Sequence, residues 1–340
     1  MKAKSPTVHE KLDDITPKLI ELFPHRFLSQ VKTIYDAFWL LFHFRTHILK
    51  SRDLAGSAEE YYFYFTYERP DAVDTLKENL DTESTNIIDG FVKKWKGILQ
   101  NSLLNYDFVH SDNMNQTNKL RNSLNISRKK YPTISIVPEI FYYHSGLVYL
   151  PKAVLIRIKH SDVIDCGAFT GDSSLVFEKN YSFGKIHAFE PNANNYMKLL
   201  DTIRRYQLRT VIPIQKAVGY SPAKGVTIHN GSGSTIEISR KNLPNDEGIE
   251  ICSIDSFLTH TKGRIGVIKM DIEGFEREAL KGAVKTIRKY KPVLLISIYH
   301  STQDFFEIKP FLESLHLGYR FKIRKLNPYK SLYEVMLIAY

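Results

Sequence analysis

The hydrophobic residues of this 340-residue chain follow two different periods, which divide it into two regions. Up to about residue 105 they recur at helical spacing, as at Ile34 and Phe38. A polar stretch, residues 115–130, then offers almost nothing to bury. We therefore predict an N-terminal helical region over residues 1–130 and a second domain over residues 131–340.

The second region changes to short apolar runs separated by helical patterns, such as those at residues 194–205 and 275–290. Runs that are apolar on both faces and alternate with helices indicate a parallel sheet covered on both sides. The predicted strands lie at residues 161–167, 185–190, 210–218, 265–273 and 291–299.

The end of the chain has a different pattern. Two further strand-like runs, residues 319–326 and 333–340, are joined by only six residues. This connection is too short for a helical crossover, so we expect an antiparallel pair. The predicted fold class is α/β, with a Rossmann-like, mostly parallel sheet, an antiparallel final strand pair and an N-terminal helical region.

Composition and charge limit the kinds of molecule that this protein is expected to bind. The formal net charge is +10, but basic residues are interspersed with acids in both halves. A solvated surface therefore explains them better than a nucleic-acid or anionic-glycan contact. The two cysteines, Cys166 and Cys252, form no metal-binding or disulfide pattern, which fits a reducing compartment.

Targeting signals are not evident. The N-terminus lacks the apolar stretch of a signal peptide. The most apolar early run, residues 37–42, is flanked by Asp36 and Arg45, so we expect a buried helix rather than a membrane span. We predict a cytoplasmic protein.

The segment VIDCGAFTGDSS, residues 163–174, combines a strand, a glycine turn and a helix start. Gly167 allows close approach of a ligand, and the helix that begins near Asp172 presents unpaired N–H groups. The next predicted strand ends at Glu190, about 25 residues after Asp165. A carboxylate at that place accepts hydrogen bonds from ribose hydroxyls, so the pattern indicates a nucleoside pocket.

The acidic residues around the glycine turn indicate which nucleoside the pocket binds. The dinucleotide pattern GxGxxG is absent, which disfavours a dehydrogenase. Asp165 and Asp172 would repel a pyrophosphate but attract a cation or an amino group, and S-adenosylmethionine carries both. The alternative is that these two carboxylates only cap turns.

From about residue 136 to its end the chain resembles the FkbM family of S-adenosylmethionine-dependent methyltransferases. These are class I, Rossmann-like enzymes that mostly methylate hydroxyls of sugars and glycosylated natural products. The segments that carry the resemblance are DCGAFTGDS (165–173), FEPN (189–192), KMDIEGFE (269–276) and IYHSTQD (298–304).

The resemblance implies a cofactor site for S-adenosylmethionine. The loop at residues 230–235 either reaches the cofactor or is an ordinary glycine turn. The implied cofactor-binding residues are Asp165, Gly167, Ala168, Phe169, Thr170, Gly171 and Asp172 at the methionine end, Glu190, Pro191 and Asn192 at the ribose, and Ala217 and Val218 at the adenine.

Candidate catalytic residues follow two neighbouring strands. Side chains alternate, so Lys269, Asp271 and Glu273 emerge on one side if the strand continues that far. The next strand ends at Tyr299 and His300, so Asp271, Glu273 and His300 are expected to converge beside the methyl group. His300 or Asp271 would act as the base. Two alternatives stay open: the trio binds a divalent metal, or His300 is a capping or core residue.

These patterns predict an O-methyltransferase that acts on a hydroxyl of a carbohydrate or glycoconjugate. The N-terminal region would shape acceptor access or an oligomer contact, and Tyr142, Tyr143 and His144 are candidate pocket lids. The alternatives are an RNA methyltransferase, motivated by the positive charge, and a non-catalytic cofactor-binding module.

Overall fold

The computed structural model describes residues 60–100, 114–227, 239–240, 248–260, 263–330 and 332–340. They belong to one compact unit, Ser57–Tyr340. The predicted apolar helix at residues 37–42 and the loop at residues 230–235 lie outside the described residues. No helix in the described part of the chain is long and apolar enough to cross a membrane.

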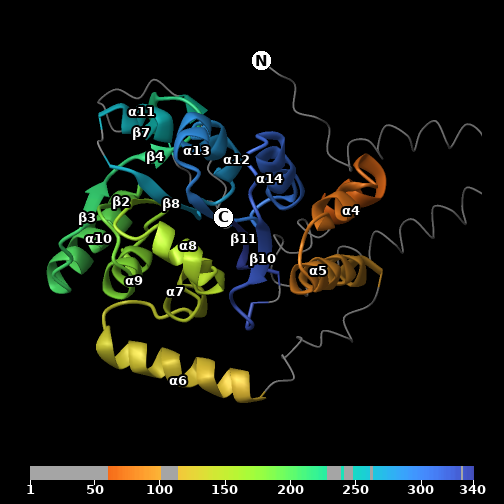
Figure 1. The fold of residues 1–340 in the computed structure, drawn as a ribbon, viewed down its shortest axis with the longest axis horizontal. Coiled ribbons are helices and arrows are strands. Elements are labelled where there is room, and N and C mark those ends of the chain that lie inside the picture. The colour runs from red at the N-terminus through yellow and green to blue at the C-terminus, as the bar shows by residue number, and fades with distance from the viewer. Residues whose placement is uncertain (1–59, 101–113, 228–238, 241–247, 261–262, 331) are drawn as a thin grey trace, which may run out of the picture. The chain divides into compact units, whose positions relative to one another are not determined.

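A seven-stranded sheet forms the centre of this unit (Figure 1). Six of the seven strands run in the same direction, and β11 runs antiparallel to both of its neighbours. The mostly parallel sheet and its antiparallel final pair are therefore confirmed. In spatial order the strands are β10 (Phe321–Lys325), β11 (Val335–Ala339), β9 (Val293–Ser297), β8 (Ile265–Met270), β1 (Asp162–Cys166), β2 (Ile186–Phe189) and β3 (Val211–Ile214).

Successive apolar residues of the central strands face opposite sides of the sheet, so two cores form. Val163 and Val267 pack in one core, whereas Ile164 and Ile268 pack in the other. The first core is covered by α6 (Met114–Lys130), α7 (Pro138–Phe141), η2 (His144–Tyr149), α8 (Lys152–Arg157), α9 (Asp172–Asn180) and α10 (Ala193–Arg205).

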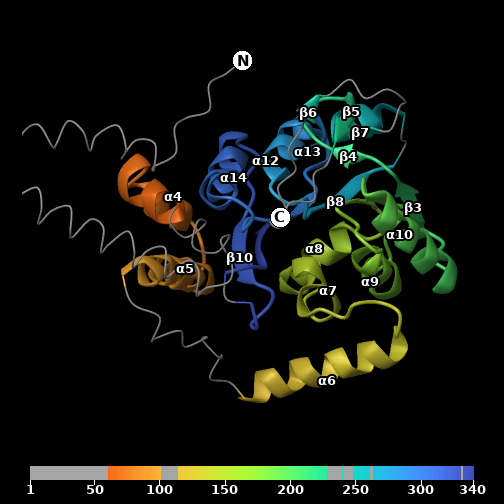
Figure 2. The ribbon, with the colours of Figure 1, turned by 180° about the vertical axis from the view of Figure 1, so that it is seen from behind.

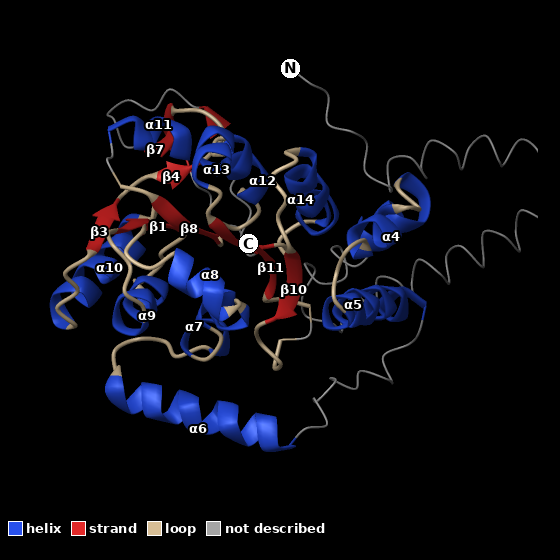
Figure 3. Cartoon of the chain, in the orientation of Figure 1, coloured by secondary structure: helices blue, strands red, loops and turns tan. Residues whose placement is uncertain are grey.

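The second core is covered by helices from both ends of the described chain (Figures 2 and 3). They are η1 (Tyr64–Glu68), α4 (Ala72–Lys77), α5 (Thr82–Gln100), α11 (Ile254–Phe257), α12 (Glu276–Lys281), α13 (Val284–Tyr290) and α14 (Thr302–Ser314), with the short η3 (Leu258–His260) after α11.

A second, smaller sheet was not predicted. It consists of β4 (Ala217–Val218), β7 (Ile249–Cys252), β5 (Ala223–Thr227) and β6 (Ser239–Arg240). This sheet also explains why the predicted helix at residues 275–290 is two helices, α12 and α13. They meet at Gly282, where a Cβ atom would overlap the carbonyl oxygen of Gly219, next to β4.

The polar stretch at residues 115–130 belongs to helix α6, which buries Leu120 and Leu124. Leucines four residues apart lie on one helix face, and this narrow contact holds an otherwise polar helix. The domain boundary after residue 130 stays a prediction.

Residues 60–100 share the second core with the C-terminal strands. Trp95 stacks on Tyr61 and packs edge-on against Phe305 of α14, with ring centroids 3.9 and 5.0 Å apart. Arg324 of β10, whose side chain is 4% exposed, donates to Asp81 Oδ2 at 2.6 Å, just before α5. Aromatic packing and an ion pair with a buried guanidinium thus tie α5 to the edge of the sheet.

Candidate active site

The glycine turn, residues 167–171, connects β1 to α9. Gly167 and Gly171 have φ angles of +76° and +85°, which L side chains adopt only with strain. A Cβ atom on Gly167 would also overlap the carbonyl oxygen of Asp271. Sequence reasoning assigned this glycine to close approach of a ligand, whereas here its small size admits the loop that follows β8.

Asp165 lies fully buried beneath the turn. Its Oδ2 accepts hydrogen bonds from the hydroxyls of Ser173 and Ser174 at 2.6 and 2.7 Å. Its Oδ1 lies 3.3 Å from Lys269 Nζ, and this ammonium also donates to the Gly167 carbonyl oxygen at 2.7 Å. A buried lysine thus links the tip of β8 to the glycine turn.

The hydrogen bond of Lys269 is made to the glycine turn, although its charge also acts on Asp271. Strand β8 ends at Met270, so the alternation that would place Lys269 beside Asp271 and Glu273 stops there. Burial by itself would lower the pKa of Lys269, but the carboxylates nearby, Asp165 foremost, raise it above its ordinary value. The amine is a charged structural partner of the turn.

Glu190, at the tip of β2, faces the glycine turn. Its carboxylate accepts hydrogen bonds from the N–H groups of Phe169 and Asn192, both at 2.9 Å. Burial raises the pKa of Glu190, against the effect of these bonds. The predicted ribose-binding carboxylate is thus fixed in place by the backbone on both sides.

A pocket beside Glu190 contains several of the predicted cofactor residues. Its mostly apolar wall combines the turn, the end of β2, the small sheet and the loop after β8. Ile249 and Ile251 come from the unpredicted β7, and their alternation in IEIC was the available signal. The lining residues are Gly167, Phe189, Pro191, Lys216, Ala217, Val218, Ile249, Ile251, Ile272 and Phe275.

Asp172 begins α9 at the same turn, as its position in the sequence predicts. The residue is 9% exposed, and its Oδ1 accepts the N–H of Ser173 at 2.8 Å. Burial raises the pKa of Asp172 to about 6, although the charge of Lys269 acts in the opposite direction.

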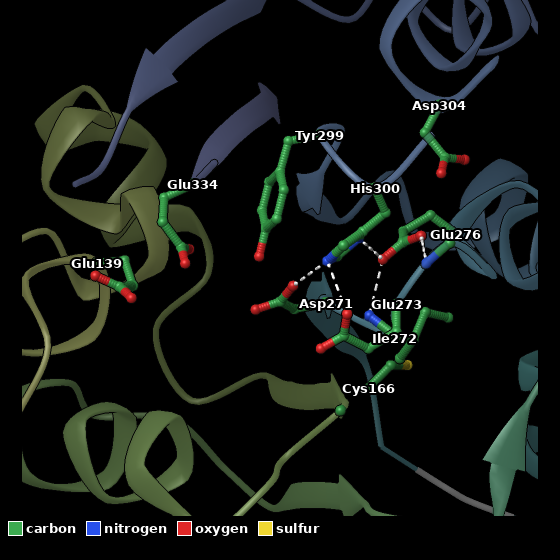
Figure 4. A network of polar contacts seen from close by, with 12 residues as sticks. Glu139, Cys166, Asp271, Ile272, Glu273, Glu276, Tyr299, His300, Asp304 and Glu334 are labelled. Atoms are coloured by element: carbon green, nitrogen blue, oxygen red, sulfur yellow. Dashed lines mark hydrogen bonds and ion pairs between the residues drawn. The ribbon is translucent and has the colours of Figure 1, made fainter. Parts of the chain in front are cut away.

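The acidic loop, residues 271–276, meets His300 just beyond the tips of β8 and β9 (Figure 4). His300 Nε2 lies 3.5 Å from Asp271 Oδ1 and 3.4 Å from Glu273 Oε2. The structure thus brings together Asp271, Glu273 and His300, as expected from neighbouring parallel strands.

Glu276 is a member of this cluster that sequence reasoning did not select. It is fully buried, and its Oε1 lies 2.9 Å from His300 Nδ1. Its two oxygens also accept the N–H groups of Ile272 at 2.8 Å and Gly274 at 2.9 Å. Glu276 therefore fixes both the shape of the acidic loop and the orientation of the imidazole.

Carboxylates outnumber cations around His300. Burial alone would lower the pKa of the imidazole, but the carboxylates around it, Glu276 first, raise it to about 10. Burial likewise opposes ionisation of Asp271, yet Lys269 and His300 lower its pKa. Burial and the charge of Glu276 raise the pKa of Asp304, behind the cluster, to about 7.

The candidate lid residues, Tyr142, Tyr143 and His144, contact neighbouring side chains. The Tyr143 ring stacks on that of Tyr149, and His144 Nδ1 lies 2.8 Å from the Tyr181 hydroxyl. Glu139, from the same segment, lies on the far side of Glu334 from the cluster (Figure 4). Figure 4 also places the Tyr299 ring between Glu334 and His300, with its hydroxyl toward Asp271.

This strand order, with a glycine turn after β1 and an acid at the tip of β2, defines a class I methyltransferase fold. Residues 165–321 match the model of the methyltransferase FkbM domain, in agreement with the family resemblance predicted from the sequence.

Solved structures agree on the fold. The methyltransferase FkbM from Methylobacillus flagellatus is 21% identical, with a TM-score of 0.56 over 83% of this chain. This chain spans 61% of the length of that protein.

More distant likenesses are an rRNA methylase from Streptococcus thermophilus and the fibrillarin of Aeropyrum pernix with bound S-adenosyl-L-methionine. The methylase is 11% identical over 61% of this chain and 97% of its own, with a TM-score of 0.36. The fibrillarin is 13% identical over 55% and 73%, with a TM-score of 0.35. No curated protein matches this chain.

Proposed function

We propose that this protein is an S-adenosylmethionine-dependent O-methyltransferase that acts on a hydroxyl group of a sugar or glycoconjugate. The observation that carries the proposal is the direct contact between the glycine turn and the acidic loop. Asp271 N donates to the Cys166 carbonyl oxygen at 3.1 Å, and Gly167 admits the Asp271 backbone. A cofactor held at the turn would therefore lie beside Asp271 and His300.

The described residues suit this cofactor. Glu190 is placed for the ribose hydroxyls, and the apolar pocket next to it suits the adenine ring. Asp172, which is largely buried, would attract the α-amine of the methionine part. When bound, S-adenosylmethionine supplies an electrophilic methyl group on a sulfonium.

The acidic loop supports transfer to a hydroxyl. The side chain of Asp271 is 28% exposed, whereas that of His300 is only 7% exposed and its Nδ1 faces Glu276. An acceptor can therefore reach Asp271 more readily than His300, and the carboxylate of Asp271 accepts the hydroxyl proton as the methyl group is transferred. Sugar hydroxyls, which bind carboxylates well, fit this surface.

The cofactor half of the proposal is tested by calorimetric titration of the purified protein with S-adenosylhomocysteine. Glu190→Ala removes two charge-assisted ribose contacts, so we expect affinity to fall about 10- to 100-fold. Glu278→Ala, an exposed acid on α12, is the matched control and should bind as the wild type does. Equal affinity in both variants would contradict the assigned role of Glu190.

The acceptor half is tested by transfer of a labelled methyl group from S-adenosylmethionine to a panel of glycans. Asp271→Asn should retain cofactor binding and lower turnover about 10²- to 10⁴-fold. Label that appears in RNA instead, with strongly salt-dependent binding, would contradict the carbohydrate assignment. Loss of cofactor binding in Asp271→Asn would contradict the division of roles between the two halves of the site.

A further inference from the structure

The acidic loop places three carboxylates around one histidine side chain, that of His300. Asp271, Glu273 and Glu276 all lie within 3.5 Å of one imidazole ring. One ligand atom each from Asp271, Glu276 and His300 also lie within 4.8 Å of one another. Grouping carboxylates is unfavourable, most of all at the fully buried Glu276, and a bound cation would offset this cost.

A second, independent observation concerns His300 itself. Its side chain is 7% exposed, yet Nε2 has no hydrogen-bond partner among the described residues. That nitrogen lies between Asp271 and Glu273, while Nδ1 faces Glu276 (Figure 4). A buried polar atom without a hydrogen bond is costly, so its place beside two carboxylate oxygens points to a ligand.

The distances suit a metal ion. Two donor atoms bonded to one ion at about 2.1 Å lie about 3.0 Å apart at octahedral angles and about 3.4 Å apart at tetrahedral angles. The observed separations from Nε2, 3.5 Å to Asp271 Oδ1 and 3.4 Å to Glu273 Oε2, are close to these values.

We infer that His300 Nε2, Asp271 and Glu273 form a binding site for a divalent cation, with Glu276 as the carboxylate that orients the histidine. A ligating histidine whose other ring nitrogen faces a carboxylate is the usual arrangement in metal sites. One imidazole and two carboxylates suit Mn²⁺, Fe²⁺ or Zn²⁺ better than Ca²⁺.

The role that we infer for the cation rests on the proposed methyl transfer. The ion coordinates the acceptor hydroxyl and makes it more acidic. The hydroxyl proton passes to a carboxylate oxygen of Asp271, the new O–C bond forms as the S–C bond breaks, and the products are a methyl ether, S-adenosylhomocysteine and a proton. Vicinal hydroxyls of a sugar, which can chelate an ion, are the acceptor that this site favours.

The test measures Mn²⁺ binding directly, without cofactor or acceptor. After treatment with a chelator, the full chain is titrated with Mn²⁺ while the electron paramagnetic resonance signal of free Mn²⁺ is followed. We expect one bound ion per chain. His300→Ala and Asp271→Asn should abolish saturable binding, and Glu276→Gln should weaken it about 10- to 100-fold.

Two matched controls are His316→Ala and Glu278→Gln, which change exposed residues of the same types outside the cluster and should bind Mn²⁺ as the wild type does. Thermal melts and S-adenosylhomocysteine titration show whether each variant is folded. The metal site would be overturned if the wild type bound the cofactor but not Mn²⁺. It would also be overturned if the cluster variants bound Mn²⁺ as the wild type does. Either result would leave the proposed function intact. Mn²⁺ binding without cofactor binding would support the metal site and overturn the proposed function.

Discussion

Two carboxylate sites lie at the same edge of the sheet, one at the end of β1 and the other just after β8, and they are built in opposite ways. Asp165 is surrounded by two serine hydroxyls and the ammonium of Lys269. His300 is instead surrounded by three carboxylates. The first site pairs a carboxylate with a cation and joins two strand tips, whereas the second gathers three carboxylates around one histidine.

This difference indicates that the two sites at this edge of the sheet have different roles, one in folding and the other in binding. A buried carboxylate with an ion pair and hydrogen bonds fixes the backbone in one arrangement. A cluster of several carboxylates around one histidine costs stability, and such clusters are typical of functional sites. The comparison therefore predicts that changes in the first site affect folding most, and that changes in the second affect binding.

The largest expected effect comes from removing the cation of the first site. Lys269→Met leaves Asp165 buried without its ion-pair partner, so the free energy of unfolding should fall by about 3–5 kcal/mol. Lys281→Met, at a half-exposed lysine of α12, should stay within about 0.5 kcal/mol of the wild type. Urea unfolding measures both, and a small loss for Lys269→Met would refute the structural role of this pair.

The next effect concerns the contact between the two sites. Gly167→Ala places a Cβ atom against the Asp271 carbonyl at a φ angle of +76°, and we expect a loss of about 2–4 kcal/mol. Gly90→Ala is the control, because no atom lies within 4 Å of its added methyl group. That variant should gain up to about 1 kcal/mol from helix propensity. Equal stabilities in urea would show that the turn can move away from the loop.

A smaller effect tests whether Asp172 belongs to the binding surface. Its pKa in the folded state is about 6, above its ordinary value of 3.8, so the unfolded chain releases this proton at lower pH. Stability should therefore fall between pH 4 and pH 6 and stay reduced above pH 6. Asp172→Asn should raise the free energy of unfolding by about 1–3 kcal/mol at pH 8 and by nearly nothing at pH 4. Unfolding curves at both pH values check the sign, and a loss at pH 8 would contradict it.

The sheet could be predicted from the sequence because its signals are local. Apolar runs such as VLLIS indicate buried strands, and the six residues before the final strand permit only an antiparallel pair. The small sheet was missed because its strands have only two to five residues and pair across residues distant in sequence. Strands this short carry too little periodicity to be recognised.

In the candidate site, too, contacts between side chains could be predicted from the sequence only in part. Adjacent strand tips brought Asp271 and His300 together as expected. The buried role of Glu276 depends on positive φ angles at Glu273 and Gly274, which turn the chain so that Glu276 reaches back to His300. Sequence alone presents these acids as equivalent. The alternation that grouped Lys269 with Asp271 and Glu273 ends with β8 at Met270, so the catalytic role of Lys269 stays a prediction.

The aromatic packing between residues 60–100 and the C-terminal strands has a consequence for how this domain is inherited. The family match begins at residue 165, yet Trp95 and Tyr61 cover Phe305 and Phe306 of α14. Asp81 meanwhile supplies the counter-ion of Arg324. A recombination event that moved only the matched segment into another protein would expose apolar rings and a buried guanidinium. The matched segment therefore keeps these groups covered only together with the helices of residues 60–100.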